Sequence, residues 1–502
     1  MQAGFGAACT AFRLLSVSRC SHANAGIGAR EEIVLFAKGK ALCCLVLVAL
    51  FVVVAPVVPT QAALGDFSLE DEAELGQKFN ILVRSRFPLI HDPIVVNQVQ
   101  DILTRVTQTL PSQPFDTTLG ILRDGSVNAF AAPAGYVFVN SGLVLAMRSE
   151  DELAAVLAHE MAHVTERHIA RNIERSQAIN LATLAGVLAG VMLGGGSEAG
   201  QALAVGSMAS GQAAALKYSR DDEREADHLG LQYLARSGYD PEGMARAFER
   251  IKERMRLSGT GGRPAYMSTH PGVTERIGYI RDVAQRLKGD RSWDSGPSRR
   301  FLKVQTLLRA RYTDAESAWN YFRQYEGKSC FRRLGSGIAA ARLNRIDRAR
   351  ELLQGEPPCE HISALWHREL GRFHFGLGQF DKARFHLEKA LDESPNDYMA
   401  LFFLARIMGE KGEIDQAEEA LQRVIRYVPA DAQVHRTLGR ILGRSGDTFS
   451  GYLHYAYAAL YRNRKEKCAS YLDKLRQLAE SGEQRQKLER FEEKYEVRKK
   501  YW

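Results

Sequence analysis

The amino-acid sequence predicts a mainly α-helical protein, with a small β-sheet in its first folded domain and a helical repeat array after it. Three observations support this fold class. Two short stretches that alternate apolar and polar residues precede a capped helix carrying two histidines. The second half of the chain repeats aspartate, alanine and glycine at a step of 34 residues. At 502 residues, the chain is too long for one hydrophobic core of ordinary size.

An apolar segment near the N-terminus predicts export. Two lysines precede the run ALCCLVLVALFVVVA, and small residues follow it up to Ala63. A charged start, an apolar centre and a small-residue end are typical of a cleavable secretory signal, here residues 38–63 of a leader that covers 1–63. The alternative is an uncleaved membrane anchor, because residues 41–58 are just long enough to span a bilayer.

Charge and cysteine usage fit an exported globular protein. The formal net charge is +8, but Lys and Arg are mixed with Asp and Glu without a long run, so no nucleic-acid partner is predicted. The cysteines beyond the leader are Cys330, Cys359 and Cys468, and no CxxC motif joins them. In an oxidising compartment Cys330 and Cys359 could pair, a point that the sequence leaves open.

The first folded domain is predicted to cover residues 66–287. It begins with amphipathic helices (LEDEAELGQKFNILVRSRF and NQVQDILTRVTQTL), followed by the strands TTLGILRDG and GYVFVNSG around the turn-rich VNAFAAPAG. A helix is expected to begin at Ser149, because Ser149 and Glu152 have the spacing of a capping box. Leu153 and Val156 give that helix an apolar stripe.

Two segments later in this domain bear on its function. The apolar residues 178–196 are interrupted by glycines and are short for a membrane-spanning helix. They are interpreted either as a buried or interface helix, or as a lid that touches a membrane. The polar helix SRDDEREADHLGLQYLARSG then ends at Gly238. A polar linker is predicted at 288–300.

Residues 301–490 are predicted to form an α-helical solenoid. Fixed spacing of small residues allows the paired helices of stacked helix-turn-helix units to approach closely. Over residues 331–475 the pattern resembles the tetratricopeptide family, although the usual tryptophan is absent. The residues that recur at the 34-residue step are Asp347, Asp381 and Asp415, Ala349, Ala383 and Ala417, and Gly378, Gly412 and Gly446.

The pentapeptide HEMAH, residues 159–163, predicts a metal site. His159 and His163 are four residues apart on a helix, so both imidazoles can reach one ion, and Glu160 lies beside them to act on a metal-bound water. Zinc suits such ligands, and a catalytic zinc keeps one position for water. The pentapeptide also arises by chance, but the capped helix after two strands favours a site. We expect one Zn²⁺ per chain.

A site with two histidines needs a third ligand. The metzincin pattern is excluded, because Glu166 and Ile169 stand where it requires glycine and histidine. The later polar helix offers Glu223 as a ligand, with Asp227 one turn further on to accept a hydrogen bond from a ligand imidazole. From spacing alone, Glu225 remains an alternative.

Four motifs in order resemble the M48 peptidases: NAFAAPAGYVFVNSGL, HEMAH, SRDDEREAD and STHPGVTERI. The resemblance covers residues 69–282 and implies an α+β, gluzincin-like metallopeptidase fold with Glu223 as the third zinc ligand. One departure is visible, since Ala134 stands where relatives commonly have a second glycine. An alanine is tolerated there if the turn needs no positive φ.

The ligand set predicts a hydrolytic mechanism. Zinc would polarise the scissile carbonyl, and Glu160 would take the proton of the water and deliver it to the leaving amine. An extended substrate is expected to pair with an edge strand that contains Gly135, Tyr136, Val137 and Phe138. Backbone pairing of this kind ignores side chains and suits a protease of unfolded proteins.

His270, in the motif STHPG, has two candidate roles. It could donate a hydrogen bond to the oxyanion, or it could take the fourth zinc position and hold the enzyme latent. A purely structural histidine before Pro271 is the alternative.

Three functions are compatible with the sequence. The first is a periplasmic zinc endopeptidase that degrades misfolded or misassembled envelope and outer-membrane proteins, with a chaperone-like role through its repeats. The second is an assembly factor with restrained proteolysis, and the third an integral membrane M48 protease. The complete motif favours the first. Expected partners are unfolded envelope proteins, the outer-membrane assembly machinery through the repeats and, peripherally, a membrane.

Overall fold

The computed structural model describes residues 67–176, 217–257, 269–289, 296–324 and 329–500, together with the single residues 184, 188, 190, 266, 293 and 502. The predicted leader, its signal peptide and most of the apolar segment 178–196 lie outside these residues. Within the described part of the chain, no helix combines the length and apolar character needed to cross a membrane. The chain divides into two units, and all the described residues belong to the second unit, residues 65–502.

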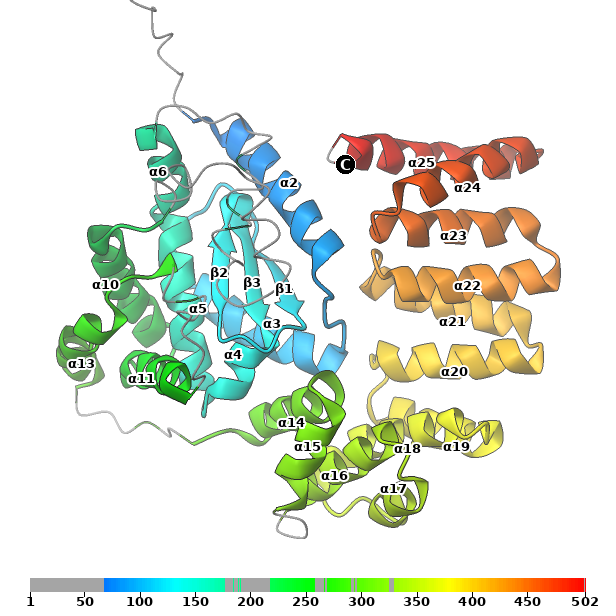
Figure 1. The fold of residues 1–502 in the computed structure, drawn as a ribbon, viewed down its shortest axis with the longest axis horizontal. Helices are drawn as coiled ribbons and strands as arrows, with labels where there is room; N and C mark the ends of the chain where they lie inside the picture. The colour runs from blue at the N-terminus through cyan, green and yellow to red at the C-terminus, as the bar shows by residue number, and fades with distance from the viewer. Residues whose placement is uncertain are drawn as a thin grey trace, which may run out of the picture. The chain divides into compact units, whose positions relative to one another are not determined.

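A three-stranded sheet lies at the centre of the first domain (Figure 1). Its strands are β1 (Thr118–Leu122), β2 (Ala129–Ala132) and β3 (Tyr136–Asn140), in the order β1-β3-β2. Strand β3 pairs in parallel with β1 and antiparallel with β2. The predicted edge strand at Gly135–Phe138 is therefore wrong, because β3 is central and both its sides are paired. Strand β2 was not predicted, since its sequence AFAA shows no alternation and all four residues are buried.

The turn that leads into β3 requires a left-handed residue. Ala134 lies in a short 3₁₀ turn (Pro133–Gly135) with φ 60° and ψ 34°. The condition for tolerating alanine is thus not met, and the conformation costs an L-residue roughly 1–2 kcal/mol. Helix α2 (Leu69–Arg86) packs directly on this turn, because a Cβ on its Gly76 would lie 2.3 Å from the carbonyl oxygen of Pro133.

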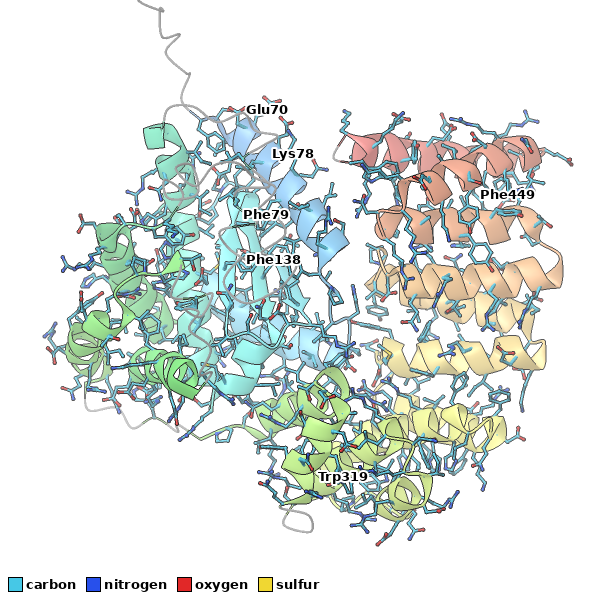
Figure 2. All side chains as sticks on the ribbon, viewed as in Figure 1. Glu70, Lys78, Phe79, Phe138, Trp319 and Phe449 are labelled. Carbon is cyan, nitrogen blue, oxygen red and sulfur yellow. A yellow bond between two sulfur atoms is a disulfide. The ribbon has the colours of Figure 1, made fainter. Side chains whose placement is uncertain are left out.

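Helices cover both faces of the sheet. On one face, Phe79 of α2 packs edge-on against Phe138, with ring centroids 6.1 Å apart (Figure 2). On the other face, α3 (Pro93–Thr107) and α5 (Glu150–Thr165) share a core with the remaining strand residues. The short α4 (Ser141–Ala146) connects β3 to the segment before α5.

Helix α5 carries the HEMAH motif and is the most buried helix of this domain. It begins where the sequence predicts, because the side chain of Ser149 accepts a hydrogen bond from the backbone of Glu152. Residues 151–163 are all buried, since further helices surround α5. These are α6 (His168–Ser176), α10 (Arg220–Arg236) and α11 (Glu242–Leu257), and α13 (Val273–Lys288) packs against α10 and α11.

The second domain begins with α14 (Arg299–Leu307) and a π-helical turn (Leu308–Tyr312), and continues as antiparallel helix pairs. A disulfide joins Cys330 to Cys359 near its start. The remaining helices are α15 (Ala315–Arg323), α16 (Cys330–Arg342), α17 (Ile346–Leu353), α18 (Ser363–Gly376), α19 (Phe380–Glu393), α20 (Tyr398–Lys411), α21 (Ile414–Tyr427), α22 (Ala432–Ser445), α23 (Thr448–Tyr461), α24 (Lys465–Leu478) and α25 (Gly482–Lys499).

The repeated residues have clear structural tasks. The alanines of the 34-residue step are buried, where a larger side chain would separate the helices. The glycines of that step turn the chain between paired helices with positive φ: Gly378 at 71°, Gly412 at 81° and Gly446 at 99°. Asn344, one step earlier, adopts the same conformation with φ 58°.

One buried arginine joins the two domains. The Arg368 guanidinium, on α18, donates to both carboxylate oxygens of Asp92 at 3.1 and 2.9 Å, and to Asp397 at 3.1 Å. Asp92 caps α3 and Asp397 caps α20, so one side chain neutralises a helix cap in each domain. The hydrophobic core is also continuous here, running from Ile90 to Phe373.

Candidate metal centre

Helices α5 and α10 bring the predicted ligands together. His159 and His163 lie on one face of α5, and Glu223 lies in the first turn of α10, whose N-cap is Ser219. The two helices approach closely at Gly230, where a Cβ would lie 3.1 Å from the Cα of His159. All three ligand candidates are buried, so their polar atoms face one another rather than water.

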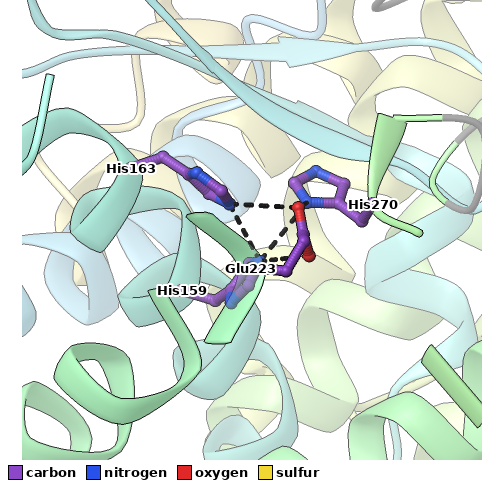
Figure 3. A group of neighbouring side chains, drawn as sticks. All are labelled: His159, His163, Glu223 and His270. Atoms are coloured by element: carbon purple, nitrogen blue, oxygen red, sulfur yellow. Dashed lines mark hydrogen bonds and ion pairs between the residues drawn. The ribbon is translucent and has the colours of Figure 1, made fainter. Parts of the chain in front are cut away.

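Four side chains form the cluster: His159, His163, Glu223 and His270 (Figure 3). The Nε2 atom of His159 lies 3.1 Å from Nε2 of His163, 3.3 Å from Nδ1 of His270 and 3.6 Å from Glu223 Oε2. His270 Nδ1 lies 3.0 Å from Glu223 Oε1. Ligands about 2.0–2.1 Å from a tetrahedral ion are separated by about 3.3 Å, so the donor atoms already have suitable spacing for one metal ion.

Glu160 lies beside the cluster with one free oxygen. Its Oε2 accepts a hydrogen bond from the backbone N–H of Ala131 in β2 at 3.1 Å. Its Oε1 has no hydrogen-bond partner within the described residues, although His270 Nε2 is 3.4 Å away. Burial raises the pKa of the Glu160 carboxyl, which makes it a better proton acceptor than an exposed glutamate.

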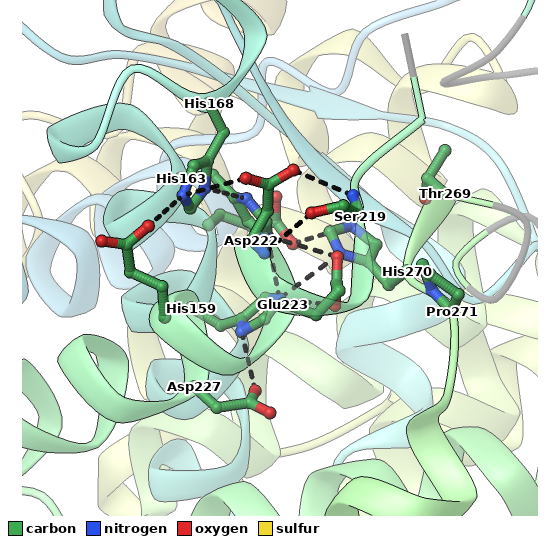
Figure 4. Close-up of polar contacts among 12 residues, drawn as sticks. His159, His163, His168, Ser219, Asp222, Glu223, Asp227, Thr269, His270 and Pro271 are labelled. Carbon is green, nitrogen blue, oxygen red and sulfur yellow. Dashed lines mark hydrogen bonds and ion pairs between the residues drawn. The ribbon is translucent and has the colours of Figure 1, made fainter. Parts of the chain in front are cut away.

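Asp227 orients His159 from the far side of the ring (Figure 4). Its Oδ1 lies 3.1 Å from His159 Nδ1, which leaves Nε2 directed at the cluster. Burial opposes a charge on His159, but hydrogen bonds to Asp227 and Glu223 outweigh it and raise the pKa of His159 to about 9. The same carboxylates would stabilise a bound cation in place of that proton.

Arg276 of α13 is a part of the centre that the sequence reasoning missed. Its Nε and Nη2 donate to the two oxygens of Asp227 at 2.7 and 2.6 Å, and its Nη1 donates to Glu223. Burial acts to raise the pKa of both carboxyls, but neighbouring charges outweigh it and lower the pKa of each. The largest lowering effect on Asp227 comes from Arg276. For Glu223 it comes from His270, followed by Arg276. Arg276 belongs to the motif STHPGVTERI, so the sequence alone could have indicated it.

His163 is oriented by a histidine rather than a carboxylate. Its Nδ1 lies 2.7 Å from Nδ1 of His168, whose Nε2 lies 3.0 Å from Glu225. Glu225 also binds Arg171 and so lies outside the cluster, whereas Glu223 lies inside it. The ring of Tyr218 stacks on His163 with centroids 3.8 Å apart and closes the site on that side.

His270 is brought into the cluster, and both its ring nitrogens face acidic groups. Nδ1 faces Glu223 and Nε2 faces Glu160, while the ring stacks on Tyr266 at 4.3 Å. The predicted substrate residues Gly135, Tyr136, Val137 and Phe138 are not part of this cluster. The strand that contacts it is β2, through Ala131.

Two family models match the chain. Residues 93–284 match Peptidase family M48, and residues 374–441 match a tetratricopeptide repeat. The first match contains the whole cluster, and the second lies within the helix pairs described above. Among solved structures, one titled MamA MSR-1 C2 aligns with 33% of this chain and 97% of its own, at 20% identity and a TM-score of 0.28.

Several curated proteins are similar in sequence. A relative from Vibrio cholerae is 30% identical over 306 residues, which is 59% of this chain and 62% of that protein. The beta-barrel assembly-enhancing protease of Yersinia pestis is 32% identical over 44% of this chain and 45% of its own, and that of Escherichia coli K12 is 28% identical over 66% and 69%. The chain thus spans less than two thirds of the first two relatives.

Proposed function

We propose that this chain, a metalloendopeptidase that joins an M48 peptidase domain to tetratricopeptide repeats, is a zinc enzyme of the periplasm. Its substrates are misfolded or misassembled envelope and outer-membrane proteins, and its repeats take part in their assembly. The observation that carries the catalytic part is the buried cluster of three imidazoles and a carboxylate beside the free oxygen of Glu160.

Zinc suits this donor set, because borderline-soft Zn²⁺ binds imidazole nitrogen and carboxylate oxygen in tetrahedral sites. When bound, it would supply Lewis-acid polarisation of a carbonyl and a more acidic water. His159, His163 and Glu223 would hold it, while Asp227 and Arg276 fix the orientation of His159 and Glu223.

Glu160 is the proposed proton carrier. Its Oε2 is held by Ala131, so Oε1 is the oxygen that takes a proton from water and returns it to the leaving amine. Ala131 donates to Glu160 rather than to β3, so the outer side of β2 faces the site. An extended substrate on that side would lie beside Oε1, and this replaces the excluded pairing with β3.

His270 is the proposed latency residue. Its Nδ1 lies 3.0 Å from Glu223 Oε1, at the spacing of a fourth ligand, and its Nε2 faces Glu160 Oε1 without a hydrogen bond. A substrate carbonyl needs that place, so the imidazole has to leave before cleavage. An oxyanion donor would instead direct an N–H toward the substrate.

The catalytic proposal is tested with Glu160→Gln and Glu223→Ala. Glu160→Gln is expected to keep about one zinc per chain and to lose casein cleavage, because only the proton acceptor changes. Glu223→Ala is expected to lose both. Full activity of Glu160→Gln would refute the mechanism, and normal zinc content in Glu223→Ala would reassign the ligand.

The role of His270 is tested by His270→Ala in the same assay. Latency predicts faster cleavage of an unstructured protein. An oxyanion donor predicts a loss of roughly 100-fold or more. An unchanged rate would leave His270 with a structural role.

The location and the substrates require a separate experiment in a bacterial host. The mature chain is expected in the periplasmic fraction, beginning at Ala63 or Leu64. Misassembled outer-membrane proteins should accumulate when wild type is replaced by Glu160→Gln. If Glu160→Gln instead supports their assembly as well as wild type does, the repeats act as an assembly factor without proteolysis.

A further inference from the structure

A second cluster of metal-ligand side chains lies in the repeat domain, away from the peptidase centre. It consists of Cys330, Cys359 and His361, whose sulfur and nitrogen atoms lie within 4.8 Å of one another. The two cysteines are joined as a disulfide, and His361 Nε2 lies 3.6 Å from Sγ of Cys330 and 3.3 Å from Sγ of Cys359. One imidazole therefore faces both sulfurs.

We propose that the reduced form of this cluster is a metal site for Zn²⁺ or a similar thiophilic divalent ion. Thiolate and imidazole are the ligands that tetrahedral zinc prefers, at about 2.3 Å for sulfur and 2.0–2.1 Å for nitrogen. The edge between a sulfur and a nitrogen ligand is then about 3.6 Å. Both sulfur–nitrogen distances already lie close to this value.

Only the sulfur–sulfur edge has to change, and reduction changes it. Two thiolates on one zinc ion are separated by about 3.8 Å, so the bond between Cys330 and Cys359 must break. Cys330 is fixed as the first residue of α16, whereas Cys359 lies in the irregular segment 354–359 between two helices. The small displacement therefore falls on Cys359, without unwinding α16.

The chemistry balances with a dithiol as reductant. A dithiol of a thiol–disulfide oxidoreductase transfers two electrons and two protons to the disulfide, giving two thiols and the oxidised partner. Binding of the ion as a bis-thiolate then releases both protons. The cluster is half-buried rather than sealed, which leaves access for the reductant and a fourth position for water. In the reverse direction, the oxidised disulfide of such an oxidoreductase takes up the two electrons, with two protons from solvent, the bond between Cys330 and Cys359 forms again, and the ion is expelled.

The site differs in kind from the peptidase centre. That centre contains no thiol, and the free Cys468 is buried in another part of the repeat domain, on α24. Among the cysteines that the structure describes, a thiolate-to-metal charge-transfer absorption can therefore come only from Cys330 and Cys359. This gives a readout that is independent of peptidase activity and of metal in the peptidase centre.

The test uses Co²⁺ and the full-length chain in which the four leader cysteines, Cys9, Cys20, Cys43 and Cys44, are replaced by serine. In the oxidised chain, Co²⁺ is expected to bind at about one site and to give no thiolate charge-transfer band. After reduction and removal of the reductant, a second Co²⁺ should bind and the near-ultraviolet band should appear. Zn²⁺ should displace this second Co²⁺ and slow alkylation of Cys330 and Cys359.

Matched variants assign the ligands. Cys330→Ser and Cys359→Ser should each abolish the band, whereas Cys468→Ser should keep it. His361→Ala should weaken Co²⁺ binding at least about tenfold, because one of three protein ligands is lost. Circular dichroism of each reduced chain checks that the helices persist. The proposal is overturned if no band appears after reduction, if His361→Ala binds as tightly as wild type, or if the reduced chain has lost its helices.

Discussion

A buried pair of histidines in the repeat array is expected to make its stability depend on pH. His435 of α22 and His454 of α23 face each other, with 3.0 Å between their Nδ1 atoms. His435 Nε2 lies 3.0 Å from the carbonyl oxygen of Pro429 and donates to it. His435 Nδ1 is then the acceptor, and His454 Nδ1 is the donor. Protonation of His435 Nδ1 would remove the acceptor and break this hydrogen bond.

Acid is expected to destabilise α22 and α23. Burial, with smaller contributions from the neighbouring His435 and Lys487, lowers the pKa of His454 to about 3. Burial likewise lowers the pKa of His435 to about 4, against the opposing effects of Pro429 and Asp431. Because the unfolded chain takes up protons near pH 6.5, the stability is complete above that pH and is lost as pH falls.

The size of this stability loss follows from the difference between the pKa of histidine in the unfolded chain and its pKa in the folded protein. At pH 5 an unfolded histidine lies about 1.5 pH units below its pKa, whereas folded His454 is still neutral. At about 1.4 kcal/mol per unit, acidification from pH 7.5 to 5 removes about 2 kcal/mol for His454 alone. The result hardly depends on the folded pKa, provided that it lies well below 5.

Hydrogen exchange of peptides from α22 and α23, corrected for the intrinsic rate at each pH, measures this loss. His454→Gln keeps a neutral hydrogen-bonding group and removes the titration, so its loss of protection between pH 7.5 and 5 should be about 2 kcal/mol smaller than that of wild type. The exposed His228→Gln is the matched control and should behave as wild type. Equal pH dependence in wild type and His454→Gln would refute the reasoning.

Three further outcomes are expected. Ala134→Gly should stabilise the peptidase domain by up to about 1 kcal/mol in thermal unfolding, because glycine relieves the left-handed strain. Ala235, which lies in an ordinary helix, is the control, and Ala235→Gly should destabilise the domain. Arg276→Met should weaken zinc binding about 10–100-fold in a chelator competition, whereas Arg281→Met on the exposed face of the same helix should not. Arg368→Ala should cost about 3–5 kcal/mol in denaturant unfolding, since it leaves two capping carboxylates buried and unpaired; a loss below about 1 kcal/mol would contradict that role.

The repeat array was largely predictable, because each repeated residue type performs one local task. Glycine at the 34-residue step marks a turn with positive φ, and alanine marks close contact between helices. The first such turn escaped notice since asparagine, Asn344, replaces glycine. Asparagine is the other residue that tolerates this conformation, so the turn before Asp347 could have been assigned to the same step.

Of the metal centre, only the residues that share one helix could be predicted from their spacing in the sequence. Four residues separate His159 from His163, and that spacing alone brings them together. The partners on other elements depend on packing: Arg276 reaches Asp227 only because α13 lies against α10, and Ala131 reaches Glu160 only because the unpredicted β2 forms the edge of the sheet. The strand order of a mixed sheet of three short strands could not be predicted, because such strands show no repeating pattern in the sequence.

The arginine shared between two helix caps restricts how the array can change its length. Repeat proteins gain and lose units by duplication, which requires that neighbouring units be interchangeable. The unit that contains Arg368 is not, because its guanidinium binds both Asp92 of the peptidase domain and the cap at Asp397. An insertion or deletion between Arg368 and Asp397 would therefore break this shared salt bridge. Beyond α20 the salt bridge sets no limit on the number of units, so a change there would leave the support of the peptidase domain at Asp92 in place.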